Sequence, residues 1–162
     1  MNTHAVALGI NTYGYVGGNP IMNTDRYGLA NDNSPYTGLP PHIAEAFRKL
    51  ERQRVLNQRQ WIGGAYDFFG NYRDMRDANT IGADKYFHCK ANCEATKRGK
   101  GGESAACTIS DSREWFDQHI KGDPASAADQ AANIFGRSNA SSPQSCSLVC
   151  SAFRPNGLPQ GY

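Results

Sequence analysis

The sequence has no long hydrophobic run, and this absence excludes one class of protein. No stretch of about 18 consecutive apolar residues occurs, so we expect no transmembrane helix. The beginning of the chain also lacks a basic segment followed by a continuous apolar one, and we therefore expect no signal peptide. The formal net charge is only +2, so the composition does not indicate nucleic-acid binding.

Apolar residues are few, whereas glycine is abundant. The mean hydropathy is −0.63, and 17 of the 162 residues are glycine, which predicts a small core and many loops. A chain of this length can still form one domain, with or without a tail.

Only five cysteines occur, but four of them form two pairs with the same spacing. Cys89 and Cys93 are four residues apart, which places both on one face of a helix, and Cys146 and Cys150 repeat this spacing. If the two segments run antiparallel, the simplest arrangement is two disulfides, Cys89 with Cys150 and Cys93 with Cys146. Such bonds require an oxidising compartment.

The alternative for the same four cysteines is a structural zinc ion held by four thiolates, with His88 nearby. The fifth cysteine, Cys107, is left over, and we expect it to be a small buried hydrophobic residue. The sequence indicates no cofactor.

Periodic apolar residues predict a chain of helices. The expected helices run from residue 43 to the break at Gly82, from Asp84 to Gly99, from about Glu103 to Lys121 and from Pro124 to Gly136. Five apolar residues of the first helix recur at intervals of three and four, and we expect them to face the core: Trp61, Ala65, Phe68, Tyr72 and Met75. The tail from Ser138 to Tyr162 is expected to wrap over the helices as extended chain, anchored by its cysteines.

Candidates for catalysis are few. His88 follows Asp84 by one helical turn, and Asp129 or Asp111 offers a second carboxylate, a set that can serve as an oriented general base. A histidine and an acid at this spacing more commonly form an exposed contact between turns, so we favour a structural role. Whether the protein is an enzyme stays open.

The first 29 residues differ in composition from the rest, with β-type fragments interrupted by glycine, asparagine and proline. The run from Gly9 to Pro20, followed by Asn23 to Leu29, resembles the closing segment of the RHS-repeat core, a β-structured shell that encloses a C-terminal toxin. The cleavage motif of that family is matched at Asp25, Gly28 and Leu29, with Arg26 in place of proline. The resemblance implies cleavage after Leu29 as a hypothesis.

A second resemblance covers roughly residues 60 to 162. Blocks such as Tyr72 to His88, Ala128 to Asn133 and Phe153 to Pro159 are similar to serum amyloid A, the vertebrate acute-phase lipid-binding family. The resemblance implies an all-α fold: a four- to five-helix antiparallel bundle with a wrapped C-terminal tail. Serum amyloid A lacks the paired cysteines and the insertion from Ser141 to Ser151, so its lipid-binding role is not transferred directly.

Together, the two resemblances predict three parts: a short β-type RHS-core remnant at 1–29, a linker at 30–42 and a helical domain at 43–162. Because RHS cores carry toxins at this position, the leading hypothesis is a toxin or effector domain of a polymorphic toxin that acts in interbacterial competition on membranes or lipids. The expected partners are the parent RHS cocoon, a cognate immunity protein and a lipid or membrane surface. Type VI or similar export would deliver the protein to an oxidising compartment such as the target periplasm.

Two alternatives remain from the sequence. One is an enzymatic toxin, a nuclease or hydrolase that uses His88 and a carboxylate such as Asp84 or Asp129. The other is a non-toxic lipid-binding or adhesion module.

Overall fold

A computed structural model describes residue 36, residues 38–122 and residues 124–162 of the chain. The chain divides into two units, Met1–Arg52 and Gln53–Tyr162. The expected β-type remnant at 1–29, the proposed cleavage residues Asp25, Gly28 and Leu29 and most of the expected linker lie outside the described residues. The groove and the buried polar cluster described below both lie in the second unit.

In the first unit, the described residues start the long helix α2 (Pro41–Ala78). Proline suits this first position because it has no amide hydrogen to leave unpaired. Before the helix, the Tyr36 ring stacks on Phe47 with a centroid distance of 5.6 Å, and the Arg48 guanidinium lies 5.9 Å from the centroid of the Tyr36 ring. These aromatic and cation–π contacts hold the helix start.

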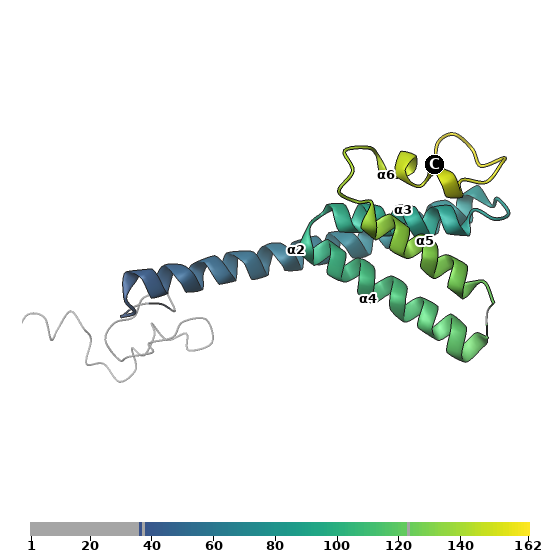
Figure 1. Ribbon diagram of the computed structural model, residues 1–162. Helices are drawn as coiled ribbons and strands as arrows, with labels where there is room; N and C mark the ends of the chain where they lie inside the picture. Colours follow the sequence, from purple (N-terminus) through teal and green to yellow (C-terminus); the bar gives the residue numbers. More distant parts are fainter. Residues whose placement is uncertain (1–35, 37, 123) are drawn as a thin grey trace, which may run out of the picture. The chain divides into compact units, whose positions relative to one another are not determined.

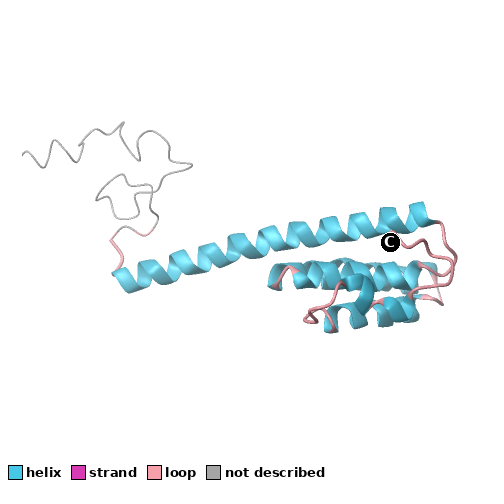
Figure 2. Ribbon diagram, turned by 90° about the horizontal axis from the view of Figure 1, so that it is seen from above, coloured by secondary structure: helices cyan, strands magenta, loops and turns pink. Residues whose placement is uncertain are grey.

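The second unit contains the rest of α2 and a series of shorter helices (Figure 1). These are α3 (Asp84–Lys97), α4 (Lys100–Phe116), the π-helical turn η2 (Asp117–Lys121), α5 (Ser126–Ser138), α6 (Cys146–Val149) and the 3-10 turn η3 (Ser151–Phe153). Figure 2 shows helices and loops but no strand in the described part of the chain. The all-α prediction is thus confirmed for those residues, and a β-type remnant finds no support in them.

Helix α3 is the centre of the core. It packs against α4, α5 and α6, and its buried apolar side chains include Tyr86, Phe87 and Cys89. The contact with α5 is close: a Cβ at position 136 would lie 2.2 Å from the Cys89 carbonyl oxygen, so only glycine fits there. Gly136 was expected to end a helix, but it lies inside α5. There the missing side chain lets the backbones of α3 and α5 approach each other closely.

The glycines from Gly99 to Gly102 also serve close packing rather than helix termination alone. We predicted that they would end α3 and that the next helix would begin at about Glu103, but α4 already begins at Lys100. A Cβ at position 101 would lie 1.9 Å from the Asn57 carbonyl oxygen of α2. Gly99 alone forms the turn, with a φ of 110° that favours glycine.

The predicted core stripe of α2 is only partly buried. Within the second unit, the α2 residues that are buried are Gly64 and Asn71, whereas Trp61 and Tyr72 are 39% and 50% exposed. Helix α2 therefore turns a small and polar face toward the rest of the unit, and its aromatic side chains lie at the edge of that contact. The prediction of a continuous core face was wrong for this reason.

The C-terminal tail lies on α3, although it is not wholly extended, because it includes the helical turns α6 and η3. The Arg154 guanidinium donates hydrogen bonds to the carbonyl oxygens of Pro159 and Tyr162, both at 2.7 Å, and lies 5.2 Å from the Tyr86 ring centroid. The Tyr162 ring meets Phe87 edge to face at 5.9 Å. These contacts cover the core side chains of α3.

No helix in the described part of the chain combines the length and the apolar character that a bilayer crossing requires.

Candidate functional site

A groove of about 480 Å³ opens among the second half of α2, α3 and α4. Most of its lining is apolar and comes from Phe68, Phe69, Tyr72, Met75, Phe87, Ala91 and Ile109. The polar lining consists of Asn71, His88, Ser110 and Arg113. An apolar cavity with a few polar side chains is the usual form of a binding site for a small amphipathic molecule.

The groove exists because α2 meets α3 through polar side chains rather than through its aromatic ones. The Asp67 carboxylate accepts a 2.7 Å bond from the Arg98 guanidinium. The Asn71 amide donates to Glu94 at 2.6 Å and accepts from Lys90 at 3.0 Å. The stripe that includes Phe68 and Tyr72 lies beside these contacts and forms a wall of the groove.

A second apolar feature of α2 faces solvent and adjoins the groove at Phe69, which belongs to both. We call Val55, Ile62, Tyr66 and Phe69 the α2 stripe, because intervals of seven, four and three residues place them on one helix face. Tyr66 and Phe69 are 70% and 64% exposed. Arg59 and Arg73 are exposed and fall on the same face at four residues from Val55 and Phe69. The α2 stripe therefore combines apolar and cationic side chains.

A buried polar cluster joins α3, α4 and α5 close to the groove. The His88 imidazole Nδ1 lies 3.0 Å from Asn133 Oδ1 and 3.5 Å from Glu114 Oε1, and its Nε2 lies 4.0 Å from Asp129 Oδ2. All four residues are at least nine-tenths buried. We call His88, Glu114 and Asp129 the His88 cluster.

Neutral amides and hydroxyls extend this cluster across the core. The Asn92 amide donates to Asn133 Oδ1 at 2.8 Å, and the Ser110 hydroxyl donates to Asn92 Oδ1 at 3.1 Å. The Arg137 guanidinium donates to Ser110 Oγ at 2.6 Å and to Asp111 at 2.9 Å. Buried polar groups must find partners of this kind, and here the partners come from three helices.

The structure changes the grouping of the predicted catalytic candidates. His88 and Asp129 do come together, but Asp84 pairs with Lys85 at 3.1 Å instead of with His88. The closest carboxylate to His88 is that of Glu114, which the sequence analysis missed. Glu114 follows Arg113 in a polar stretch of α4, and only the contact between α3 and α4 brings it to His88.

The acidic groups near His88 have opposite pKa shifts. Burial raises the pKa of Asp129; nearby Asp84 adds to this shift, whereas interactions with His88 and with the ammonium of Lys85 reduce it. Burial also opposes ionisation of Asp84, but the hydrogen bond and charge of Lys85 outweigh it and lower the pKa of that carboxyl. Of these two carboxylates, Asp129 is therefore the one whose negative charge nearby cations offset less.

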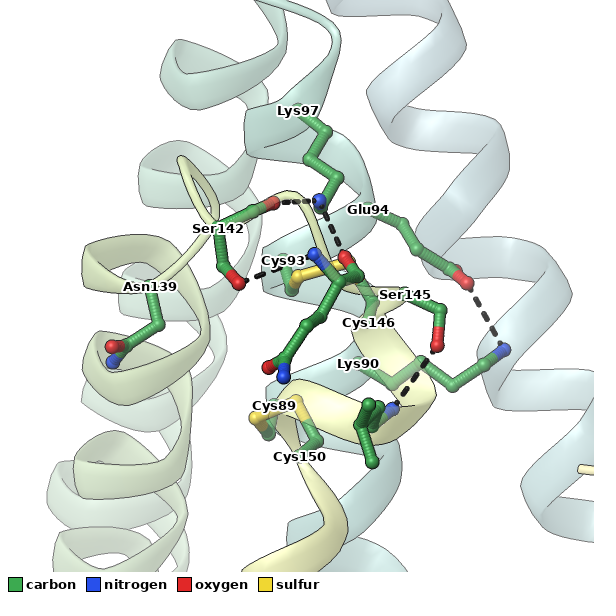
Figure 3. Close-up of a disulfide and its surroundings, with 12 residues drawn as sticks. Cys89, Lys90, Cys93, Glu94, Lys97, Asn139, Ser142, Ser145, Cys146 and Cys150 are labelled. Atoms are coloured by element: carbon green, nitrogen blue, oxygen red, sulfur yellow. Dashed lines mark hydrogen bonds and ion pairs between the residues drawn. A yellow bond between two sulfur atoms is a disulfide. The ribbon is translucent and has the colours of Figure 1, made fainter.

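Two disulfides join α3 to the tail (Figure 3). Cys89 is bonded to Cys150 with a Cα–Cα distance of 5.8 Å, and Cys93 is bonded to Cys146 at 5.7 Å. All four thiols are used in these bonds, so none is left as a thiolate ligand for the alternative zinc site. The two bonds fit an oxidising compartment.

The remaining cysteine, Cys107, is free and half-buried, so it is more accessible than the predicted buried residue. Near the disulfides, the Lys97 ammonium donates to the carbonyl oxygens of Ser142 at 2.6 Å and Gln144 at 2.8 Å, as Figure 3 shows for Ser142. Lys97 therefore fastens the inserted segment to α3.

Comparison with known proteins shows what the chain is similar to. Residues 55–162 match the family described as serum amyloid A protein. The chain is 48% identical to the duck (Anas platyrhynchos) serum amyloid A protein over 102 residues, which are 62% of this chain and 74% of the relative. It is 45% identical to the horse (Equus caballus) protein over 108 residues, 61% of this chain and 91% of the relative. It is 47% identical to human serum amyloid A-1 protein over 100 residues, 61% and 75% of the two chains.

These matches correct the leading hypothesis from the sequence. The relatives are animal serum amyloid A proteins, and the matches give no support to an RHS core at the beginning of the chain. The predictions of a polymorphic toxin acting in interbacterial competition, of an RHS cocoon and an immunity protein as partners, and of type VI or similar export were wrong. Short fragments of glycine, asparagine and tyrosine suggested them, whereas the helical resemblance covers most of the chain.

The family model covers more than half of the chain, and several relatives exceed 45% identity over about a hundred residues. The chain therefore belongs to the serum amyloid A family.

Proposed function

We propose that this protein binds an anionic amphipathic lipid, such as a fatty acid, with the apolar chain in the groove among α2, α3 and α4. The observation that carries the proposal is the lining of the groove, which is mainly aromatic and aliphatic and yet open to solvent. Apolar side chains that are left uncovered in this way gain about 25 cal/mol per Å² when a ligand removes them from water.

The polar lining supports an acidic headgroup. Arg113 lines the groove, and its side chain is 48% exposed. Its ion pair with Asp117 has an N–O distance of 3.5 Å. An exposed pair of this kind contributes little to stability, so the guanidinium can turn to a ligand carboxylate at small cost. Arginine also suits a carboxylate, because it can donate two parallel hydrogen bonds.

Family membership supports the same class of ligand, because serum amyloid A is a lipid-binding family, although the paired cysteines and the insertion argued against a direct transfer of that role. The two disulfides lie on the tail side of α3, whereas the groove lies among α2, α3 and α4. The cysteine-bearing insertion therefore leaves the groove open, and the departure from the family does not stand in the way of lipid binding. The proposed function is lipid binding without toxic activity.

Displacement of a fluorescent fatty acid from the full chain tests the proposal. Tyr72→Asp places a charge in the groove at a side chain that is 50% exposed, so folding should be preserved, and we expect affinity to fall by roughly tenfold or more. Tyr66→Asp is the matched control, because Tyr66 is also exposed but does not line the groove. Equal loss in both variants, or none in Tyr72→Asp, would reject the groove as the site.

Arg113→Gln separates headgroup from chain recognition. We expect weaker binding of a fatty acid and unchanged binding of the corresponding uncharged alcohol, because only the carboxylate loses its cation. If both ligands lose affinity equally, Arg113 does not contact the headgroup.

A second candidate function rests on the α2 stripe. Its exposed Ile62, Tyr66 and Phe69, together with Arg59 and Arg73, suit the interface of an anionic lipid surface, where apolar side chains enter and guanidinium groups meet phosphates. Binding to phosphatidylserine vesicles should then fall in Tyr66→Asp and persist in Tyr72→Asp, the reverse of the result for the groove. Equal vesicle binding by wild type and Tyr66→Asp would reject the stripe.

A further inference from the structure

We propose that the His88 cluster binds one divalent metal ion of the zinc class in the core of the protein. The three residues come from three helices: His88 from α3, Glu114 from α4 and Asp129 from α5. One ligand atom from each lies within 4.8 Å of the others. One imidazole nitrogen with two carboxylate oxygens is a ligand set that zinc and related ions accept.

The His88 imidazole is prepared for such a role. Its Nε2 has no hydrogen-bond partner among the described residues, and because the side chain is only 6% exposed, bulk water does not easily supply one. With the proton on Nδ1, the ring donates to Asn133 Oδ1 at 3.0 Å, and the lone pair of Nε2 is left free, 4.0 Å from Asp129 Oδ2. A partner that orients the second ring nitrogen is the usual support of a metal-bound histidine.

The distance between His88 and Asp129 fits a metal ion and is too long for a hydrogen bond. Their Nε2 and Oδ2 atoms are 4.0 Å apart. Zinc bonds to nitrogen and oxygen are each about 2.0–2.2 Å long, so two ligand atoms of a tetrahedral site lie about 3.4 Å apart, and His88 and Asp129 need to close by only about 0.6 Å around an ion. The Glu114 carboxylate, held by the Ser126 hydroxyl at 3.0 Å, has an oxygen within 4.8 Å of ligand atoms of His88 and Asp129 and supplies the third ligand.

The charge balance around the cluster favours a cation. Two carboxylates are buried there, and the ammonium of Lys85 lies 3.4 Å from Asp129 Oδ1. The same ammonium lies 3.1 Å from Asp84, so it keeps a partner when a metal ion replaces it at Asp129. Lys85 is therefore the competitor of the metal.

Zinc titration of the full chain by calorimetry, after removal of metals with a chelator, tests the site. We expect one ion per chain in the wild type and, in Asp129→Asn, a loss of affinity on the order of tenfold or more, because a ligand is removed while the shape is kept. His119→Gln is the control: this exposed histidine bonds to the Trp115 carbonyl oxygen and is not a member of the cluster, so its removal should change nothing.

Lys85→Met distinguishes metal binding from a merely structural cluster. Removal of the competing ammonium should tighten zinc binding by roughly tenfold, and loss of folding cannot mimic a gain of affinity. Circular dichroism of each variant without metal checks that the helices persist. The absence of zinc binding in the wild type, or equal affinity in wild type, Asp129→Asn and Lys85→Met, would overturn the proposal.

Discussion

The Cys93 sulfur on α3 is bonded to the Cys146 sulfur, although the two cysteines are 53 positions apart in the chain. The bond between Cys89 and Cys150, one helical turn away, spans 61 positions. Each cysteine pair has the spacing of one helical turn, so the two bonds lie side by side and hold the tail along α3 at two points. The tail is polar and rich in proline, and it would not stay ordered on composition alone.

Removal of these bonds should release the tail. A disulfide that closes a loop of this length stabilises the folded protein by about 4 kcal/mol in the chain-entropy model. The Cys89–Cys150 bond adds less than this, because its loop already contains the Cys93–Cys146 bond. Reductant should therefore lower the free energy of unfolding, measured by urea denaturation, by several kcal/mol. Cys107→Ser is the control, since Cys107 is free and its replacement should leave the reductant effect unchanged. An unchanged midpoint in reductant would contradict the account of the tail.

Arg154 should be a local anchor of the last residues. Its guanidinium donates to the carbonyl oxygens of Leu158, Pro159 and Tyr162. In Arg154→Met the disulfides remain, so we expect faster amide hydrogen exchange from position 155 onward and little change in α6. Faster exchange throughout the tail would show instead that Arg154 holds the whole segment.

The glycines at helix crossings should differ sharply in their tolerance of alanine. At Gly101 a Cβ would lie 1.9 Å from the Asn57 carbonyl oxygen, so α2 and α4 must separate, and we expect Gly101→Ala to cost about 1–3 kcal/mol. At Gly70 in α2 a Cβ meets nothing within 4 Å, so Gly70→Ala should stabilise by about 0.5–1 kcal/mol through helix propensity. Thermal unfolding of the two variants measures both effects. Similar midpoints would mean that the crossing is not close.

The two carboxyls beside Lys85 should give opposite pH dependence, measured in the presence of a chelator. The pKa of Asp129 is raised in the folded state, so the folded protein keeps this proton to higher pH than the unfolded chain does. Wild type should therefore lose stability relative to Asp129→Asn as pH rises from the ordinary value of 3.8 through the raised one.

The pKa of Asp84 is lowered, and the sign reverses. Its contribution is fully present above the ordinary value of 3.8 and is lost as pH falls through the lowered one, so wild type should gain stability relative to Asp84→Asn as pH rises. Urea denaturation of the three proteins between acid and neutral pH measures both slopes. Slopes of the same sign would contradict the assigned environments.

The sequence predicted α3 closely, because strong local signals mark both ends. Asp84 favours the first turn of a helix, and Gly99 takes a positive φ that most residues avoid. The cysteine spacing likewise predicted the two pairs that the structure contains, since only one antiparallel arrangement joins both without crossing. Such features depend on neighbours in sequence or on the pitch of one helix.

Features that depend on contacts between helices were not predictable. The aromatic stripe that includes Trp61 and Tyr72 looked like a core face, but the glycine and polar side chains of α2 form the contact instead. Glu114 carries no local sign of its approach to His88, because only the packing of α4 on α3 creates it. The groove arises from such packing and was not found from the sequence, whereas the sequence named His88 and Asp129 of the His88 cluster but not Glu114.

An amphipathic lipid in the groove among α2, α3 and α4 can be located by its contacts. The most direct measurement is photo-crosslinking of the full chain with a fatty acid that carries a diazirine in its chain, followed by peptide mass spectrometry. The account predicts labels on lining residues such as Tyr72, Met75 and Ile109, with competition by unlabelled fatty acid and loss in Tyr72→Asp. Labels spread over α5 and the tail, or labelling that excess fatty acid does not reduce, would contradict it.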